Sequence, residues 1–160
     1  MRAAGINVKS GLVYLAVLEP GDGLLGKPVS TVRSRIGPGA GLDGAEKLDD
    51  FKNRIRQEFQ TGGVQTVGLV ETRAYTGWNY HKAHDRITAI CAVMAAATEF
   101  RATYATIKTS DIGRAVGVPA AALETVRAEQ FGFESAPTYW TAGLAEAYAA
   151  AATALVRAAQ

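Results

Sequence analysis

The sequence has 160 residues, of which 48% are hydrophobic and 20% charged, so it is long enough for one domain with a sizeable core, and disorder is not expected. Seventeen Lys and Arg residues against 15 Asp and Glu give a net charge of only +2, so a basic surface depends on local placement. The single cysteine, Cys91, excludes disulfides and cysteine-rich zinc sites. Because Lys9 and Ser10 interrupt the N-terminal apolar run, we expect neither a signal peptide nor a membrane span, and predict a cytoplasmic protein.

Three strands are predicted at the start of the chain, over residues 3–8, 12–18 and 29–36. Lys9-Ser10-Gly11 separates the first two, and this turn-forming trio predicts a tight hairpin. The third segment mixes polar and apolar residues without two clean faces, as is typical of an edge strand.

A helix is predicted after the glycine-rich segment 37–41. Asp43 followed by Glu46 is a common pattern at helix starts, and apolar residues then recur at helical spacing until Gly62-Gly63 ends the helix. The glycine-rich segment lacks the Lys-Ser/Thr of a phosphate-binding loop, so it is interpreted as a connector.

The rest of the chain alternates strands and helices. The short apolar run 64–71 ends in Glu71 and predicts a buried central strand, and a further strand is predicted over 103–107. A long helix is expected between them, over residues 81–100, with a buried stripe of Ile87, Ile90, Met94 and Ala97.

Helices are predicted for the final part of the chain. A short one begins at Ser110-Asp111 and ends near Gly117, and another covers residues 120–130. Pro137 opens the last, alanine-rich helix. One of its faces carries Trp140, Leu144, Tyr148, Ala151 and Leu155.

This order of elements predicts an α/β protein. A hairpin-linked triplet of strands followed by alternating helices and strands favours a mixed five-stranded sheet, with the first three strands antiparallel and helices packed on both sides. No linker divides residues 1–160, so one domain is expected.

Three segments resemble the RuvC-like Holliday junction resolvases of the ribonuclease H-like superfamily. Residues 5–17 resemble their opening hairpin, the strand ending at Glu71 resembles their fourth strand, and Tyr104 to Lys108 resembles their fifth. The resemblance implies a ribonuclease H-like fold, Mg²⁺-dependent cleavage of branched DNA, and a homodimer. It places Asn7, Glu71 and Lys108 at the family's catalytic positions.

Departures from the family pattern affect the metal-binding carboxylates. Asn7 stands where the family has an aspartate, and our alignment puts Trp140 and Gly143 where its last helix has two acids. A pair of Mg²⁺ ions requires hard, anionic oxygen ligands, so we predict that nuclease activity is lost or weakened. If activity survives, Mg²⁺ is the expected cofactor, with Glu71 and Glu146, one helical turn beyond Gly143, as ligands.

A nucleic-acid-binding surface is expected around the first hairpin and the start of the long helix. The family has a base-stacking aromatic in the loop after the glutamate; Tyr75 lies one position from that register, and Trp78 follows. Basic side chains contact phosphates, and aromatic rings stack on unpaired bases. The residues assigned to this surface are Lys9, Ser10, Arg73, Tyr75, Lys82 and Arg86. Alternatively, the aromatic rings pack the helix start and the charges form a solvated face.

Three functions therefore remain open at this point. The first is a RuvC-like protein that binds branched or structured nucleic acid, DNA rather than RNA, with lost or weakened cleavage. The second is an active Mg²⁺-dependent endonuclease with rearranged ligands. The third is a non-catalytic interaction subunit, whose alanine-rich last helix packs through Trp140 and Tyr148 against a second copy or another protein. No membrane partner is expected.

Overall fold

The computed structural model describes residues 1–22, 25–72 and 77–160. Its mixed sheet has the order β3-β2-β1-β5-β6, and β4 also pairs with β2. β1 and β2 form an antiparallel hairpin, while β5 and β6 run parallel to β1. The strands described are β1 (Ala3–Lys9), β2 (Leu12–Glu19), β3 (Lys27–Pro28), β4 (Arg35–Ile36), β5 (Thr66–Val70) and β6 (Thr103–Ile107).

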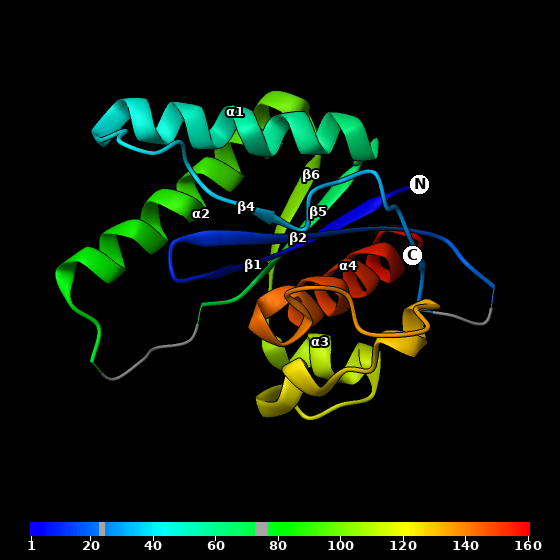
Figure 1. The fold of residues 1–160 in the computed structure, drawn as a ribbon. Coiled ribbons are helices and arrows are strands. Elements are labelled where there is room, and N and C mark those ends of the chain that lie inside the picture. The colour runs from blue at the N-terminus through cyan, green and yellow to red at the C-terminus, as the bar shows by residue number, and fades with distance from the viewer. Residues whose placement is uncertain (23–24, 73–76) are drawn as a thin grey trace.

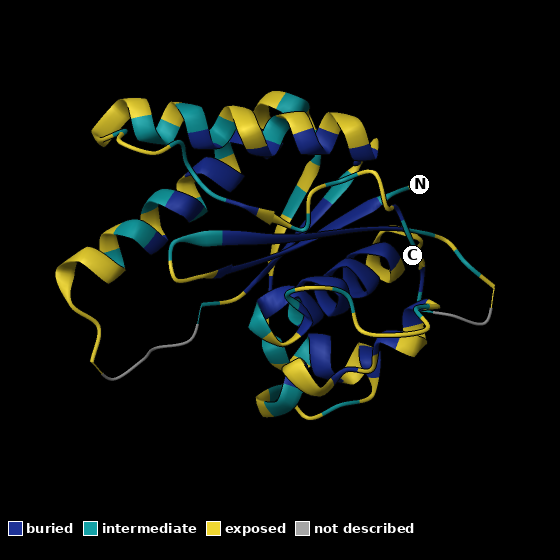
Figure 2. Ribbon diagram, in the orientation of Figure 1, coloured by how far each residue is buried: buried dark blue, intermediate teal, exposed yellow. Residues whose placement is uncertain are grey.

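Helices cover both faces of the sheet (Figure 1). α1 (Gly44–Gly62) and α2 (Tyr80–Phe100) lie on one face, and α3 (Thr109–Val116) and α4 (Ala145–Ala158) lie on the other. Figure 2 shows the buried residues of these helices on the sides that face the sheet. Shorter helical turns are η1 (Ala120–Thr125), η2 (Ala128–Phe131) and the π-turn η3 (Trp140–Leu144). None of the described helices is long and apolar enough to cross a bilayer.

The α/β class, the mixed sheet and its antiparallel first part are confirmed. The N-cap of α1 is Asp43, whose carboxylate accepts a hydrogen bond from the Gly44 amide at 2.7 Å, and the helix ends at Gly62. β5 and β6 lie within one or two residues of their predicted bounds. These elements had strong caps or clean apolar runs, so local sequence was sufficient to locate them.

The predicted third strand is wrong, and as a result the described sheet has six strands rather than five. Between two short pairings with β2, at β3 and β4, residues 30–33 leave the sheet. Along this segment the Arg33 amide donates to the Glu58 carboxylate of α1 at 2.9 Å instead of pairing with a strand. The helix therefore satisfies a backbone group that a continuous strand would have paired.

The predicted buried stripe of α2 is partly wrong. Ile87 is 60% exposed and Met94 46% exposed, and Ile90 is half-buried. The helix instead buries a face made mainly of small residues: Arg86, Ala89, Ala92, Val93, Ala96 and Ala97. Small side chains let α2 lie close to the sheet and to α1, and this close packing leaves the larger side chains outside.

The last helix is buried rather than available to a partner. The helix begins at Ala145 rather than at Pro137, and Trp140 and Leu144 of the predicted face lie in the π-turn η3. The described residues from Ala147 to Leu155 are all buried, and α4 packs on β1, β2 and β5. Trp140 and Tyr148 belong to this core, with ring centroids 5.3 Å apart. The proposal that α4 docks on a second copy or another protein is therefore wrong.

The helical segment predicted over 120–130 consists of two 3₁₀ turns, η1 and η2. Val126 and Arg127 are extended between them, and the Val126 carbonyl accepts a hydrogen bond from the Trp140 indole at 2.9 Å. This long-range hydrogen bond holds the backbone out of a continuous helix. It also places η1 beside the carboxyl end of the sheet.

Candidate nucleic-acid interface

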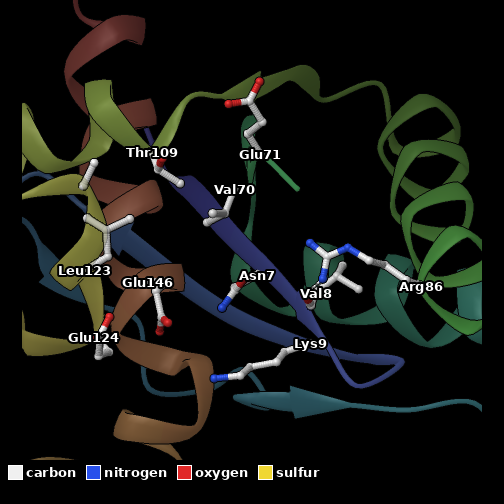
Figure 3. Close-up of a pocket in the computed structure, with 11 residues that line it drawn as sticks. Asn7, Val8, Lys9, Val70, Glu71, Arg86, Thr109, Leu123, Glu124 and Glu146 are labelled. Carbon is white, nitrogen blue, oxygen red and sulfur yellow. Dashed lines mark hydrogen bonds between the residues drawn. The ribbon is translucent and has the colours of Figure 1, made fainter. Parts of the chain in front are cut away.

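The carboxyl ends of β1 and β5 open into a cavity of about 180 Å³ at one edge of the sheet. Asn7 of β1 lies opposite Tyr14 of β2, and the register of the parallel strands places Val70 and Ile107 in the same row. The cavity is lined by Asn7, Val8, Lys9, Val70, Glu71, Arg86, Thr109, Ala120, Leu123, Glu124 and Glu146 (Figure 3).

Asn7 is held by the π-turn that precedes α4. Its side-chain nitrogen donates a hydrogen bond to the carbonyl oxygen of Gly143 at 3.2 Å, and the residue is only 8% exposed. Gly143 has a φ of 145°, and a Cβ there would lie 2.8 Å from the Tyr14 ring, so only glycine fits this turn. Asn7 therefore acts as a hydrogen-bond donor at the position where the resemblance implies an anionic metal ligand.

The carboxylates around this cavity lie on different sides of it. Glu146, in the first turn of α4, has a buried Oε2 atom with no hydrogen-bond partner among the described residues. Burial raises its pKa and the charge of Glu124 raises it further, whereas its own backbone hydrogen bond and the charge of Lys9 lower it. Figure 3 shows the carboxylate of Glu71 pointing away from Asn7 and Glu146. Glu71 is also exposed.

Glu124 was not identified from the sequence. It lies on η1, and the segment around it contains no motif or spacing that marks a site. Its place in the cavity depends on the fold of the two 3₁₀ turns beside the sheet. Only the three-dimensional packing could have identified it.

These residues do not fit the pair of Mg²⁺ ions that the resemblance implies. Within the described ranges, no group of three or more His, Cys, Asp or Glu side chains is arranged to hold a metal ion. Magnesium requires near-octahedral coordination by several hard oxygen atoms, and a two-metal site requires carboxylates that bridge or flank both ions. Glu71 and Glu146 both line the cavity, but they approach it from different sides, with Asn7 between them (Figure 3).

Lys108 lies at the carboxyl end of β6, where it is the N-cap residue of α3. It is exposed, does not line the cavity and, in the part of the chain that the structure describes, makes no ion pair with Glu71. His81 and His84 lie on the exposed first turns of α2, each with its ring centroid 5.8 Å from that of Tyr80.

A second cavity, of about 430 Å³, adjoins the first and brings together four of the residues assigned to nucleic-acid binding: Lys9, Ser10, Lys82 and Arg86. Trp78 also lines it and is 40% exposed. Lys9 and Arg86 line both cavities, so the two form one continuous surface. Arg73 and Tyr75 lie outside the described residues.

Arg86 of this surface makes its hydrogen bonds inside the protein. Its guanidinium is mostly buried and donates to the Val8 carbonyl at 2.6 Å and to the Thr72 hydroxyl at 3.0 and 3.1 Å. It also lies over the Trp78 ring, 5.7 Å from the ring centroid. Arg86 therefore ties α2 to the end of β1 and to the segment after β5, and it positions Trp78.

Basic side chains without an acidic partner gather at this end of the sheet. Most lysines and arginines of the described ranges lie within 4 Å of a carboxylate. Four basic residues of these ranges have no such partner and lie near this end of the sheet. Lys9 and Arg35 lie by the β1–β2 hairpin turn, Lys82 lies at the start of α2, and Lys108 follows the carboxyl end of β6. Two others, Lys27 and Arg101, lie at the opposite end of the sheet.

No protein-family model matches the sequence, and no curated protein matches it. The fold is similar to that of Thermus thermophilus RuvC in complex with a Holliday junction substrate, with a TM-score of 0.75 and 19% identity over 96% of this chain and 92% of that one. A second T. thermophilus RuvC structure gives a TM-score of 0.74, again at 19% identity, with the same coverage of both chains. The chain therefore has the RuvC fold, a member of the ribonuclease H-like class, as the resemblance predicted.

Proposed function

We propose that this protein binds branched or otherwise structured DNA at the carboxyl end of its sheet, and that its nuclease activity is lost or weakened. The observation that carries the proposal is the placement of unpaired basic side chains. Although the net charge is only +2, this end of the sheet carries four basic side chains with no carboxylate of the described residues within 4 Å, namely Lys9, Arg35, Lys82 and Lys108.

Such side chains are available to nucleic-acid phosphates. A lysine or arginine already paired with an acid must give up that partner before it binds a phosphate, whereas an unpaired one only releases the phosphate's counterion. Trp78 adds a partly exposed ring beside Lys82 that suits stacking on an unpaired base. The fold similarity supports the same conclusion, because one of the similar structures is a complex with a Holliday junction.

Loss of cleavage follows from the poor fit between this site and Mg²⁺. The Asn7 amide is bonded to Gly143, the Glu71 carboxylate points away, and Glu146 is partly buried. We propose that Asn7, Glu71 and Lys108 mark the position of the family's catalytic groups, and we assign them no catalytic step.

Fluorescence anisotropy with a labelled four-way junction, a linear duplex and a single strand at two salt concentrations tests the proposal. We expect junction binding that exceeds duplex binding and that weakens as salt rises. Lys9→Gln and Lys82→Gln should each lower the slope of log K against log salt by about 1. Lys27→Gln is the matched control, because it removes an unpaired charge at the opposite end of the sheet.

The alternatives predict different outcomes of the same experiment. Absence of junction binding at low salt contradicts the proposal and favours an interaction subunit. Cleavage of the junction in Mg²⁺ that Glu71→Gln abolishes favours an active endonuclease. Equal loss of affinity in Lys27→Gln and Lys82→Gln would mean that binding is not localised to the carboxyl end of the sheet.

We further propose that the protein forms a homodimer through the outer face of α2 rather than through α4. Residues 87–98 contain no charged side chain, and Ile87, Cys91 and Met94 are exposed along one face of the helix. A two-fold axis places this face against itself, and an uncharged apolar face does so without self-repulsion.

Light scattering should therefore give twice the chain mass, and Ile87→Glu should give a folded monomer whose melting temperature no longer depends on protein concentration. Thr98→Glu, at the end of the same face, should weaken the dimer less. A monomeric wild-type protein at micromolar concentration contradicts the dimer proposal and leaves the DNA-binding proposal untouched.

A further inference from the structure

Exposed Arg35 and half-buried Tyr139 form a cation–π pair outside both cavities. The Arg35 guanidinium carbon lies 4.2 Å from the centroid of the Tyr139 ring. Arg35 is exposed and has no carboxylate of the described chain within 4 Å, whereas Arg33, two residues earlier, is paired with Glu58 at 3.7 Å. The pair thus holds an unpaired guanidinium in a fixed place at the surface.

The structure holds the Tyr139 ring firmly under this guanidinium. Tyr139 begins the π-turn with a φ of 70°, a left-handed conformation that non-glycine residues seldom adopt. Its carbonyl accepts hydrogen bonds from the Ala142 and Leu144 amides at 3.1 Å, and its ring packs edge-on against Tyr14. Such conformations persist only where the surroundings impose them, and they cluster at binding sites.

Arg35 lies on the same side of the sheet as the cavity that contains Asn7. Asn7 pairs with Tyr14, and Tyr14 pairs with Arg35, so the three side chains form one row across β1, β2 and β4. Lys9 lies two residues further along β1. From strand spacing and rise, the Cα atoms of Lys9 and Arg35 are about 12 Å apart. Phosphates of one duplex strand recur about every 3.4 Å along the helix axis, so phosphates a few nucleotides apart on that strand span this separation.

We propose that Arg35, held on Tyr139, is a second phosphate-binding point for the DNA strand that crosses Lys9. The inference rests on the proposed DNA binding and extends that surface from the hairpin turn towards β4, on the side away from α2. Stacking occupies one face of the guanidinium and leaves its N–H edges free. Arginine can then donate two parallel hydrogen bonds to one phosphate, which lysine cannot do.

The test compares Arg35→Gln with Arg33→Gln in junction-binding titrations over a range of salt concentrations. The two changes remove the same charge two residues apart, but Arg33 is already paired with an acid. We expect Arg35→Gln to weaken junction binding about fivefold to tenfold at low salt and to lower the salt slope by about 1. Arg33→Gln should change affinity less than about twofold, since its charge is already neutralised. Thermal unfolding confirms that each variant is folded.

Two further variants separate the charge from the stack. Arg35→Lys keeps the charge, so the salt slope should stay at the wild-type value while affinity falls part of the way. Tyr139→Asn removes the ring but keeps a residue that tolerates the left-handed conformation, and it should also weaken binding. If Arg35→Gln keeps the wild-type junction affinity and salt slope while Lys9→Gln loses junction affinity, this inference is overturned and the proposed function stands. Failure of the wild-type protein to bind any junction overturns both.

Discussion

The side-chain amide of Asn7 donates a hydrogen bond to the carbonyl oxygen of Gly143 at 3.2 Å, which joins β1 to a turn 136 residues later in the chain. An aspartate at position 7 would place a carboxylate oxygen against that carbonyl and could not donate while ionised. Asparagine at this position therefore does more than lack a charge: it stabilises the turn that begins α4.

Asn7→Asp should destabilise the protein at neutral pH rather than restore a metal site. Loss of the donor leaves a buried carbonyl opposite a buried carboxylate, at a cost of about 1–3 kcal/mol. The loss should shrink at acidic pH, where a protonated carboxyl can donate again. Urea unfolding at pH 7.5 and pH 4.5 measures both effects. If Asn7→Asp is as stable as the wild-type protein at pH 7.5, the hydrogen bond between Asn7 and Gly143 does not contribute to the free energy of unfolding.

Glu146→Gln should raise the thermal stability at pH 7.5. Burial raises the pKa of Glu146, so the folded protein binds this proton more tightly than the unfolded chain, in which the pKa of the side chain is near 4.5. Stability is then lost as pH rises from about 4.5 through the folded-state pKa. Glutamine does not ionise, so Glu146→Gln avoids this loss of stability. The stability difference between the variant and the wild type should therefore disappear below pH 4.

Two controls accompany the Glu146 variant in the same melting series. Glu124→Gln removes the charge that raises the Glu146 pKa, so it should reduce the pH dependence in part. Lys9→Met removes the charge that lowers that pKa, so it should increase the dependence. Destabilisation by Glu146→Gln at pH 7.5 would mean that the carboxylate has a stabilising partner in solution.

Gly5→Ala should prevent α4 from packing on the sheet. A Cβ at position 5 would lie 1.9 Å from the Ala147 carbonyl oxygen and 2.2 Å from the Ala151 nitrogen, so the helix would have to move. We expect a loss at or above the upper end of the usual 1–3 kcal/mol for overpacking, about 3 kcal/mol or more. The control is Gly37→Ala, whose Cβ would meet only the end of the Leu12 side chain. Similar unfolding midpoints for the two variants would refute this packing.

Arg86→Lys and Lys82→Gln should separate structure from binding. Arg86 makes its hydrogen bonds inside the protein, so the lysine variant should lose about 1–3 kcal/mol of stability although the charge is kept. Lys82 is exposed and unpaired, so its variant should keep its stability and lose junction affinity. Calorimetry and anisotropy on the same preparations measure both quantities. The reverse pattern would assign direct DNA contact to Arg86 and a structural role to Lys82.

Local sequence was enough to locate the elements with strong local signals. The Lys9-Ser10-Gly11 turn, the Asp43 cap and the apolar run before Glu71 each specify their structure within a few residues. The sequence of α2 did not specify which side of the helix is buried, because its alanines allow several faces to pack. Close approach to the sheet selected a face that excludes Ile87 and Met94.

The site was only partly predictable for a related reason. Lys9, Ser10, Lys82 and Arg86 lie near elements with clear signals, and they do line one cavity. Tertiary contacts place the Asn7–Gly143 bond, the Arg35–Tyr139 pair and Glu124, because the π-turn and the 3₁₀ turns have no local pattern that predicts them.

One measurement tests the central proposal most directly: the wild-type protein is titrated into a labelled four-way junction in EDTA and in Mg²⁺, and the DNA from each titration is then run on a denaturing gel. If Lys9 and its neighbours bind the junction without a metal site, the junction affinity should be the same in both buffers at matched ionic strength. Binding to the junction should be stronger than to linear duplex, and the DNA strands should remain intact. Binding that requires Mg²⁺, accompanied by nicks at the junction, would contradict it.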